Sequence, residues 1–150
     1  MKFLRLALCA LLLAGCAGTP SIDDSYTARG QSSRVQYIVL HYTSTDFTRS
    51  LALLTQGEVS AHYLIGEGSA KVYRLVDENR RAWHAGDSSW QGRTWLNAST
   101  LGIELVNQGY VEGPDGRHWQ PYDEVQIQAL IALLKDLVKR HDLPIDSIIG

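Results

Sequence analysis

A continuous hydrophobic run near the start of the chain constrains the fold more than any other feature. Residues Val35 to Tyr42 are nearly all apolar or β-branched and show little alternation of polar and apolar side chains. Such a run is typical of a central strand covered on both faces, so other elements must pack on each side of its sheet. The strand ends at His41 and a hydroxyl-rich stretch. This arrangement can deliver a histidine to a metal or catalytic site, and it is also common in strands that have no such role.

The rest of the chain predicts elements that could cover this strand. The strongest signal is an amphipathic helix over residues 122–142, with an apolar stripe from Val125 to Val138 and basic residues in its last turn, which suit the helix dipole. A short helix is expected before Gly57. Strands are expected over residues 61–69 and 71–77 as a β-hairpin, over 101–107, and over 145–150. The predicted fold is therefore α/β: a single domain with a central mixed β-sheet flanked by helices.

Three local features add to this prediction. Residues 78–100 have no usable period and contain three of the four tryptophans, and a loop of that length in a compact domain is usually functional. Gly102, inside the predicted strand 101–107, marks a position where a side chain must be absent or another segment comes close. Residues 113–116, GPDG, predict a turn.

The N-terminal residues are typical of an exported bacterial lipoprotein. Lys2 and Arg5 precede an apolar stretch that is too short to span a bilayer. The tetrapeptide LAGC, which closes on Cys16, resembles the bacterial lipobox, in which the cysteine is acylated and becomes the mature N-terminus. We expect a signal peptide over residues 1–15, a lipidated Cys16 with a flexible tether over residues 16–33, and the folded domain over residues 34–150. The alternative is an ordinary signal peptide with an incidental cysteine.

The residue after Cys16 bears on localisation. It is Ala17 and not aspartate, which by resemblance to enterobacterial sorting signals favours a lipid anchor in the outer membrane, with the domain facing the periplasm. The other cysteine, Cys9, lies in the segment to be removed, so no disulfide is expected. The chain has 14 Lys+Arg against 16 Asp+Glu and 20% charged residues, which argues against nucleic acid as a partner. The sequence does not indicate an oligomeric state.

Five side chains are candidates for chemistry: His41, His62, His84, Asp87 and Glu104. The chain lacks the HExxH, CxxC, GxSxG and P-loop patterns, which removes the usual forms of helical zinc proteases, thiol clusters, serine hydrolases and nucleotide-binding loops. Residue types and spacing alone therefore give candidate residues but do not define a site. They support an exported α/β domain that could be a hydrolase.

Taken together, four ordered segments resemble a known family. They are YIVLHYTST, then VSAHYLIGEGSAKVYRLVDENRRAWHAG, then LNASTLGIELVN, and finally the amphipathic helix leading to IIG. In this order they resemble the N-acetylmuramoyl-L-alanine amidases, zinc enzymes related to phage lysozyme-type amidases and peptidoglycan recognition proteins. The resemblance covers residues 34–150 and implies the same fold.

The resemblance implies roles for particular residues. His41 matches the first zinc ligand of the family, with Zn²⁺ as the cofactor, and Glu104 matches the acidic residue that acts near the attacking water. Trp83, His84 and Asn97 fall on loops that border the substrate groove. For His62, a role in the site and simple packing as a hydrogen-bonded histidine both remain open. Zinc with three protein ligands lowers the pKa of bound water to about 7, and a nearby carboxylate can then transfer its proton.

The resemblance also implies a substrate, the amide between N-acetylmuramic acid and L-alanine in peptidoglycan or muropeptides. In the family, the second and third zinc ligands follow the segment that matches IIG. We therefore expect them beyond Gly150, with the chain as written a C-terminally truncated amidase of weak or no activity. Two alternatives are a non-catalytic muropeptide-binding domain of the same fold and a lipid-anchored structural protein of the envelope. A carboxylate at Glu104 favours the enzyme over the binding domain.

Overall fold

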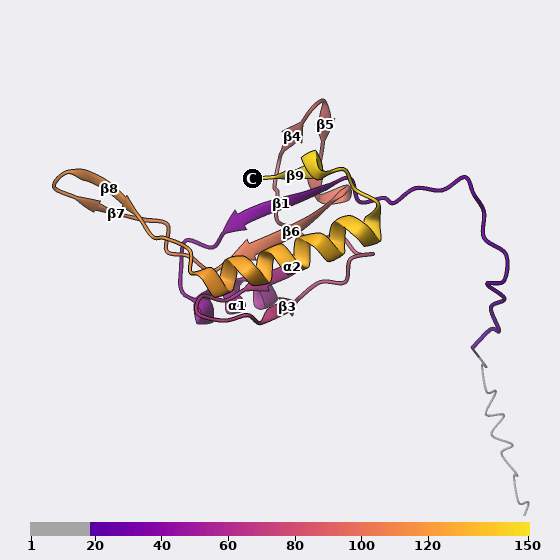
Figure 1. Cartoon of the computed structure of the whole chain (residues 1–150), viewed down its shortest axis with the longest axis horizontal. Coiled ribbons are helices and arrows are strands. Elements are labelled where there is room, and N and C mark those ends of the chain that lie inside the picture. The colour runs from indigo at the N-terminus through magenta and orange to yellow at the C-terminus, as the bar shows by residue number, and fades with distance from the viewer. Residues whose placement is uncertain (1–18) are drawn as a thin grey trace, which may run out of the picture. The chain divides into compact units, whose positions relative to one another are not determined.

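The structure is a computed structural model that describes residues 19–150 (Figure 1). The expected signal peptide and the lipidated Cys16 lie outside the described residues. The chain divides into two units, residues up to Gln31 and Ser32–Gly150. Residues 19–31 are exposed and contain no helix or strand. In the part of the chain that the structure describes, no helix is long and apolar enough to cross a membrane.

A five-stranded mixed sheet organises the second unit. Its strand order is β3-β2-β6-β1-β9. The pairs β1·β6, β1·β9 and β2·β6 are parallel, and β2·β3 is the antiparallel hairpin predicted from the sequence. The predicted α/β class with a mixed sheet is confirmed. The strand bounds are β1 Tyr37–Tyr42, β2 Tyr63–Ile65, β3 Val72–Arg74, β6 Thr100–Leu105 and β9 Ile148–Ile149.

The two main helices pack into separate apolar clusters. Helix α2, Glu124–His141, lies along the sheet in Figure 1 and buries Ala129, Leu130 and Leu137 in the same cluster as alternate strand residues. Those strand residues are Ile38, Tyr63, Ile65, Leu101, Ile103 and Leu105. Helix α1, Phe47–Gln56, packs through Leu54 with Ala61, Leu64 and Val106. Because neighbouring residues of a strand point to opposite faces, the side chains between those facing α2 are presented to the other face.

Helix α2 is fixed at both ends and at one buried polar position. The Asp123 side chain accepts a hydrogen bond from the Gln126 N–H at the N-terminus, and Asp142 ends the helix in a left-handed conformation. The Gln126 side chain is buried and donates to the carbonyls of Ile65 and Val106, where strands β2 and β6 end. Val125 is 48% exposed, so the expectation that it joins the apolar stripe is wrong. The buried line begins instead at Gln126.

Residues 78–100, expected as a loop without period, contain short elements. Strands β4, Ser89–Trp90, and β5, Arg93–Thr94, form a hairpin, and a 3₁₀ turn follows at Leu96–Ala98. The two residues between the strands, Gln91 and Gly92, both have positive φ, as a two-residue hairpin turn requires. The sequence signal for this hairpin is only the Gln-Gly pair, because neither strand alternates between buried and exposed residues.

A third hairpin extends away from the sheet (Figure 1). It consists of β7, Tyr110–Gly113, and β8, Gly116–Trp119, joined at the turn predicted from GPDG. The sequence does not predict these strands, since nearly every residue in them is exposed and no buried face imposes a period. A final 3₁₀ turn, Ile145–Ser147, leads into β9.

Candidate functional site

Strands β1 and β6 bring the two main predicted site residues together. His41 and Glu104 are direct partners in the parallel register, and Leu64 of β2 is the next residue in the same row. Paired residues of neighbouring strands point to the same face, so His41 and Glu104 both lie on the face opposite α2. The order of strands and their register thus create a histidine–carboxylate pair near the carboxyl ends of two parallel strands.

The Glu104 carboxyl group is buried without a full set of partners. Its Oε2 atom is buried and has no hydrogen-bond partner among the described residues. Burial raises the pKa of Glu104 from the ordinary value of 4.5 to about 7. A carboxyl group with a pKa near neutrality is present in both protonation states at physiological pH, so it can accept a proton and later return it.

A chain of hydrogen bonds orients the His41 ring. The Thr100 hydroxyl donates its proton to the Leu96 carbonyl at 2.7 Å, so it accepts from His84 Nε2 at 3.1 Å. A neutral His84 protonated at Nε2 has a free lone pair on Nδ1, which accepts from His41 Nε2 at 3.0 Å. Neutrality is favoured because burial, and then the neighbouring His41 and His62, lower the pKa of His84 to about 3. This arrangement leaves the His41 lone pair on Nδ1.

Two further residues hold His84 in place. A Cβ at Gly102 would overlap the His84 ring, so the sequence prediction that a side chain must be absent there is confirmed. The Asn97 side chain is buried, and its Oδ1 accepts from the His84 and Ala85 N–H groups at 3.1 and 2.8 Å. Asn97 therefore shapes the groove by fixing the loop that carries His84.

His62 has a structural role. It is fully buried, its Nδ1 accepts from the Gly102 N–H at 3.0 Å, and its Nε2–H donates to the Arg80 carbonyl at 3.2 Å. Burial lowers the pKa of His62, in agreement with a neutral ring. Both ring nitrogens have hydrogen-bond partners, so of the two possibilities for His62 the structure supports that of a packed histidine.

A groove of about 560 Å³ opens beside Glu104. Its lining includes the predicted Trp83, His84 and Asn97 and the candidate Asp87, together with Leu54, Glu58, Val59, Ser60, Gly86 and Trp95. Trp95 was not singled out from the sequence. It has a positive φ of 57° and is 66% exposed, so the backbone holds a large aromatic side chain out in solvent at the groove. Strain of this kind is concentrated at functional sites.

The metal site is only partly formed by the described residues. Within residues 19–150, no three His, Cys, Asp or Glu side chains lie close enough to hold a metal ion. His41 offers a free lone pair on a held ring, which suits a ligand, but catalytic zinc needs three protein ligands. The residues present therefore do not make a complete zinc site.

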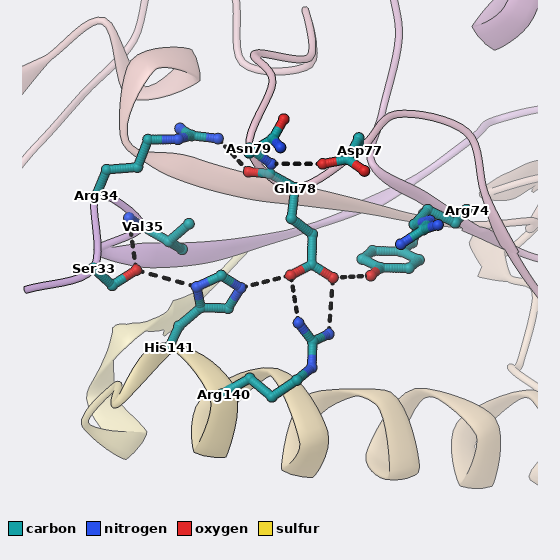
Figure 2. Close-up of a pocket in the computed structure, with 10 residues that line it drawn as sticks. Ser33, Arg34, Val35, Arg74, Asp77, Glu78, Asn79, Arg140 and His141 are labelled. Atoms are coloured by element: carbon teal, nitrogen blue, oxygen red, sulfur yellow. Dashed lines mark hydrogen bonds and ion pairs between the residues drawn. The ribbon is translucent and has the colours of Figure 1, made fainter. Parts of the chain in front are cut away.

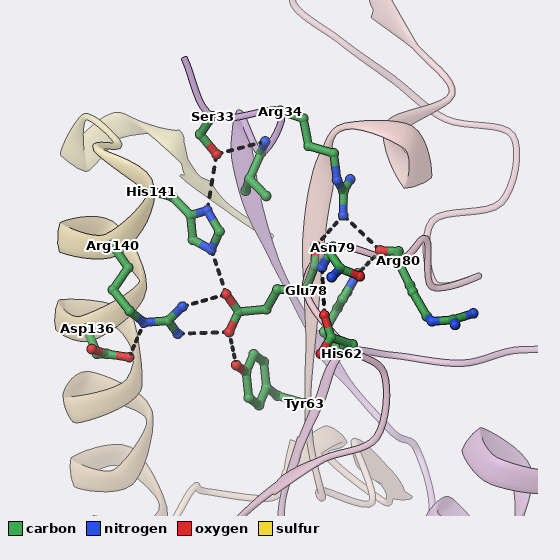
Figure 3. Close-up of polar contacts among 12 residues, drawn as sticks. Ser33, Arg34, His62, Tyr63, Glu78, Asn79, Arg80, Asp136, Arg140 and His141 are labelled. Atoms are coloured by element: carbon green, nitrogen blue, oxygen red, sulfur yellow. Dashed lines mark hydrogen bonds and ion pairs between the residues drawn. The ribbon is translucent and has the colours of Figure 1, made fainter. Parts of the chain in front are cut away.

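A second polar cluster lies beside the residues that precede β1 (Figures 2 and 3). The Glu78 carboxylate accepts from both terminal nitrogens of Arg140, at 2.6 and 2.8 Å, from His141 Nε2 at 2.7 Å, and from the Tyr63 hydroxyl. The Arg140 hydrogen bonds outweigh burial and lower the pKa of Glu78 to about 2. A pocket of about 470 Å³ adjoins the cluster, and the Glu78 carboxylate that borders it already has its hydrogen-bond partners within the protein.

The Glu78 cluster has a structural interpretation. It ties the end of α2 to the loop after β3, at the opposite end of β1 from His41. From the sequence, His141 at the end of the helix is expected only to be solvated or to interact with the helix dipole, and the structure adds Glu78 as a hydrogen-bond partner. Glu78 carries no signal in the sequence, because its partners Arg140 and His141 lie 62 and 63 residues away in the chain and Tyr63 lies 15 residues away.

A mixed sheet of this order, with a histidine and a buried carboxyl group paired near its strand ends, is the architecture of a peptidoglycan amidase. The model of the N-acetylmuramoyl-L-alanine amidase family matches residues 31–150, and the chain belongs to this family. It is 39% identical to the N-acetylmuramoyl-L-alanine amidase AmiD of Escherichia coli, over 99% of this chain and 59% of AmiD. It is 36% identical to the 1,6-anhydro-N-acetylmuramyl-L-alanine amidase AmpD of Haemophilus influenzae, over 66% of this chain and 49% of AmpD.

Solved structures agree with this assignment. AmiD from Escherichia coli, in complex with the substrate anhydro-N-acetylmuramic acid-L-Ala-D-gamma-Glu-L-Lys, superposes with a TM-score of 0.77 and 38% identity, covering 85% of this chain and 52% of AmiD. AmpDh3 from Pseudomonas aeruginosa, in complex with an anhydromuramic pentapeptide, gives a TM-score of 0.75 and 37% identity, covering 88% and 57% of the two chains. The chain thus spans about half to three-fifths of the length of these relatives.

The contact between Gly102 and His84 predicts the effect of adding one methyl group. Gly102→Ala should displace the His84 ring, break its hydrogen bond to His41 and lower the free energy of unfolding by about 1–3 kcal/mol. Imidazole ¹⁵N chemical shifts and urea denaturation would measure both effects. Gly66→Ala is the control, because its Cβ would meet only the Phe47 ring at 3.4 Å. Unchanged His41 and His84 resonances in Gly102→Ala would contradict this packing.

The buried Glu104 carboxyl group should cost stability at high pH. Its pKa is higher in the folded state, so stability falls as pH rises from about 4.5 to about 7, and the full cost is present above that range. Glu104→Gln should therefore raise the free energy of unfolding of chelator-treated protein at pH 8 by up to about 3 kcal/mol, and much less at pH 4. Urea denaturation at the two pH values measures this, with the exposed Glu58→Gln as control. A destabilised Glu104→Gln protein at pH 8 would argue against the burial of an unpartnered carboxylate.

Glu78 should behave in the opposite way. Its pKa is lowered in the folded state, so its contribution to stability is fully present above about pH 4.5 and is lost as pH falls towards 2. Glu78→Gln should lower the free energy of unfolding by about 3 kcal/mol at pH 7, and the difference from wild type should shrink at pH 3. Unfolding curves at both pH values provide the measurement. A difference that does not change with pH would show that the cluster acts through packing and not through charge.

Proposed function

We propose that this chain forms the catalytic domain of an enzyme that hydrolyses the amide between N-acetylmuramic acid and L-alanine, in intact peptidoglycan or in muropeptides. The observation that carries the proposal is the pairing of His41 with a buried Glu104 beside an aromatic groove. The relatives named above support the reaction type, since AmiD is bound to a muropeptide substrate in its structure.

Glu104 is proposed to transfer the proton. Amide hydrolysis requires removal of a proton from the attacking water and delivery of a proton to the departing amine. A carboxyl group with a pKa of about 7 and a buried oxygen free of protein partners can do both. The adjoining groove would place the amide next to it, with the reacting groups partly shielded from bulk water.

Zn²⁺ is proposed as the cofactor, with His41 as one ligand. The His84 and Thr100 side chains would hold the imidazole in one orientation, because a metal-binding histidine is normally fixed by a hydrogen bond to its other nitrogen. The remaining ligands are not found among residues 19–150.

The groove suits a substrate that is part sugar and part peptide. Trp83, Trp95 and Val59 offer apolar surface, and Glu58 and Asp87 offer hydrogen-bond acceptors. Trp83 and His84 would contact substrate directly, whereas the buried Asn97 would act by holding the loop.

The proposed location is the outer membrane, with the domain tethered through lipidated Cys16 and facing the periplasm. The lipobox-like LAGC and the Ala17 that follows it support this location. Stable attachment requires more than one acyl chain, which lipidation of the N-terminal cysteine would supply.

Activity on a purified muropeptide tests the proposal. Two proteins without residues 1–16 are compared, one ending at Gly150 and one extended by whatever its gene encodes downstream. We expect the protein with a complete ligand set to release stem peptide, to stop on chelation and to recover with Zn²⁺. Glu104→Gln should retain the metal and lose at least about 100-fold in turnover, whereas His41→Ala should lose both. Release is measured by mass spectrometry and bound metal by elemental analysis.

The outcomes separate the competing functions. Turnover by Glu104→Gln equal to wild type would remove Glu104 from its role, and activity after complete metal removal would reject zinc chemistry. Tight binding of muropeptide with no release by either protein would instead identify a non-catalytic binding domain of the same fold.

A further inference from the structure

The β7–β8 hairpin carries an exposed aromatic surface that the catalytic pair does not use. Tyr42, Tyr110 and Trp119 form what is here called the aromatic shelf. The Trp119 ring lies 6.4 Å from the Tyr42 ring and 5.0 Å from the Tyr110 ring, centre to centre. Trp119 is 60% exposed. Clustered aromatic side chains left in solvent mark a binding surface more often than a structural one.

The base of the hairpin is held firmly to the catalytic domain. Asn107 donates to the Gln120 carbonyl and accepts from the Gly109 N–H, and the Gln120 side chain accepts from the Gln108 N–H. Gly109 has a positive φ, and a Cβ there would lie 3.0 Å from the Tyr42 ring. A lone two-stranded hairpin is marginally stable, so these contacts are what fix the shelf relative to β1 and β6.

The shelf begins at the end of β1 that carries His41. Tyr42 directly follows His41 on this strand, so the two side chains point to opposite faces of the sheet. A polymer with its amide at Glu104 would have to pass around this end of β1 to reach the shelf, in addition to the aromatic surface of Trp83 and Trp95 in the groove.

The charges of the hairpin indicate which part of such a polymer it suits. Arg117 pairs with Glu112 at 3.0 Å, and His118 pairs with Asp115 at 2.7 Å. The Arg117 guanidinium also lies 4.3 Å from the centre of the Tyr110 ring. These pairs take up the charged groups of the hairpin and leave a surface of rings and hydrogen-bonding groups with little net charge. Stem peptides carry free carboxylates and amines, whereas glycan rings present apolar C–H faces and neutral polar edges.

We propose that the aromatic shelf binds the glycan strand of polymeric peptidoglycan by stacking its rings on the faces of the sugars. This inference rests on the proposed function for the identity of the polymer. It assigns to the shelf a preference for long glycan strands, which reach beyond the groove, over short muropeptides.

Binding to isolated glycan tests the shelf without requiring catalysis. Glycan strands freed of stem peptides are immobilised, and the purified chain lacking residues 1–16 is passed over them in a surface plasmon resonance experiment. Trp119→Ala should bind about tenfold more weakly than wild type. Val111→Ala should bind like wild type, because Val111 is exposed on the same hairpin and alternates to the side opposite Tyr110. If Trp119→Ala unfolds the hairpin by circular dichroism, Trp119→Met, which keeps apolar bulk without a ring, carries the same expectation.

Three results would overturn the inference. Equal glycan binding by wild type and the Trp119 variant would remove the shelf from recognition. A loss confined to immobilised stem peptide would assign the shelf to the peptide instead. A lower molecular mass for the Trp119 variant than for wild type, measured by light scattering, would identify the hairpin as a contact between copies of the chain. Loss of amidase activity with intact glycan binding would reject only the proposed hydrolysis.

Discussion

The parallel pairing of β1 with β6 is the constraint on which the site depends. Its register sets His41 beside Glu104 and gives both side chains the same face of the sheet. On each strand, the residues that alternate with His41 or Glu104 point to α2 and form the main core. A shift of either strand by one residue would turn its polar residue towards α2 and its apolar residues away from the core. The hydrophobic effect that stabilises the fold thus also fixes the relative positions of His41 and Glu104. The same pairing brings Gly102 beneath His84, which leaves room for the ring that orients His41.

Two partly buried carboxyl groups, Glu78 and Glu104, have pKa values shifted in opposite directions. Glu78 is surrounded by donors from Tyr63, Arg140 and His141, and its pKa is lowered because the charged form is stabilised. Glu104 is buried with an unbonded oxygen, and its pKa is raised because nothing compensates for the lost water. The first arrangement joins distant segments, whereas the second keeps a proton available at neutral pH. A loss of stability at Glu104 is what the proposed catalytic role would require, because groups with strongly shifted pKa values are concentrated at functional sites.

Much of this fold follows from local pattern. The core strand, helix α2 and the β2–β3 hairpin follow from hydrophobic period, and Gly102 follows from a glycine inside a strand. The two exposed hairpins and the groove position of Trp95 have no such pattern, since no buried face imposes one. Neither His62 nor Glu78 could be interpreted from type and spacing, because their partners Arg80, Gly102, Arg140 and His141 are decided by how the chain folds back.

The sequence by itself determined the α/β class, the family, and the identity of His41 and Glu104 as candidates, because these rest on residue types, periodicity and ordered motifs along the chain. Only the tertiary structure decided that His62 is packed while His41 keeps a free ring nitrogen, that Glu78 has hydrogen-bond partners while one oxygen of Glu104 has none, and that Tyr42 and Trp119 meet in the aromatic shelf. The physical reason is that burial and hydrogen-bond partners belong to a position in space. Residues far apart in sequence create that position together, and no local window contains it.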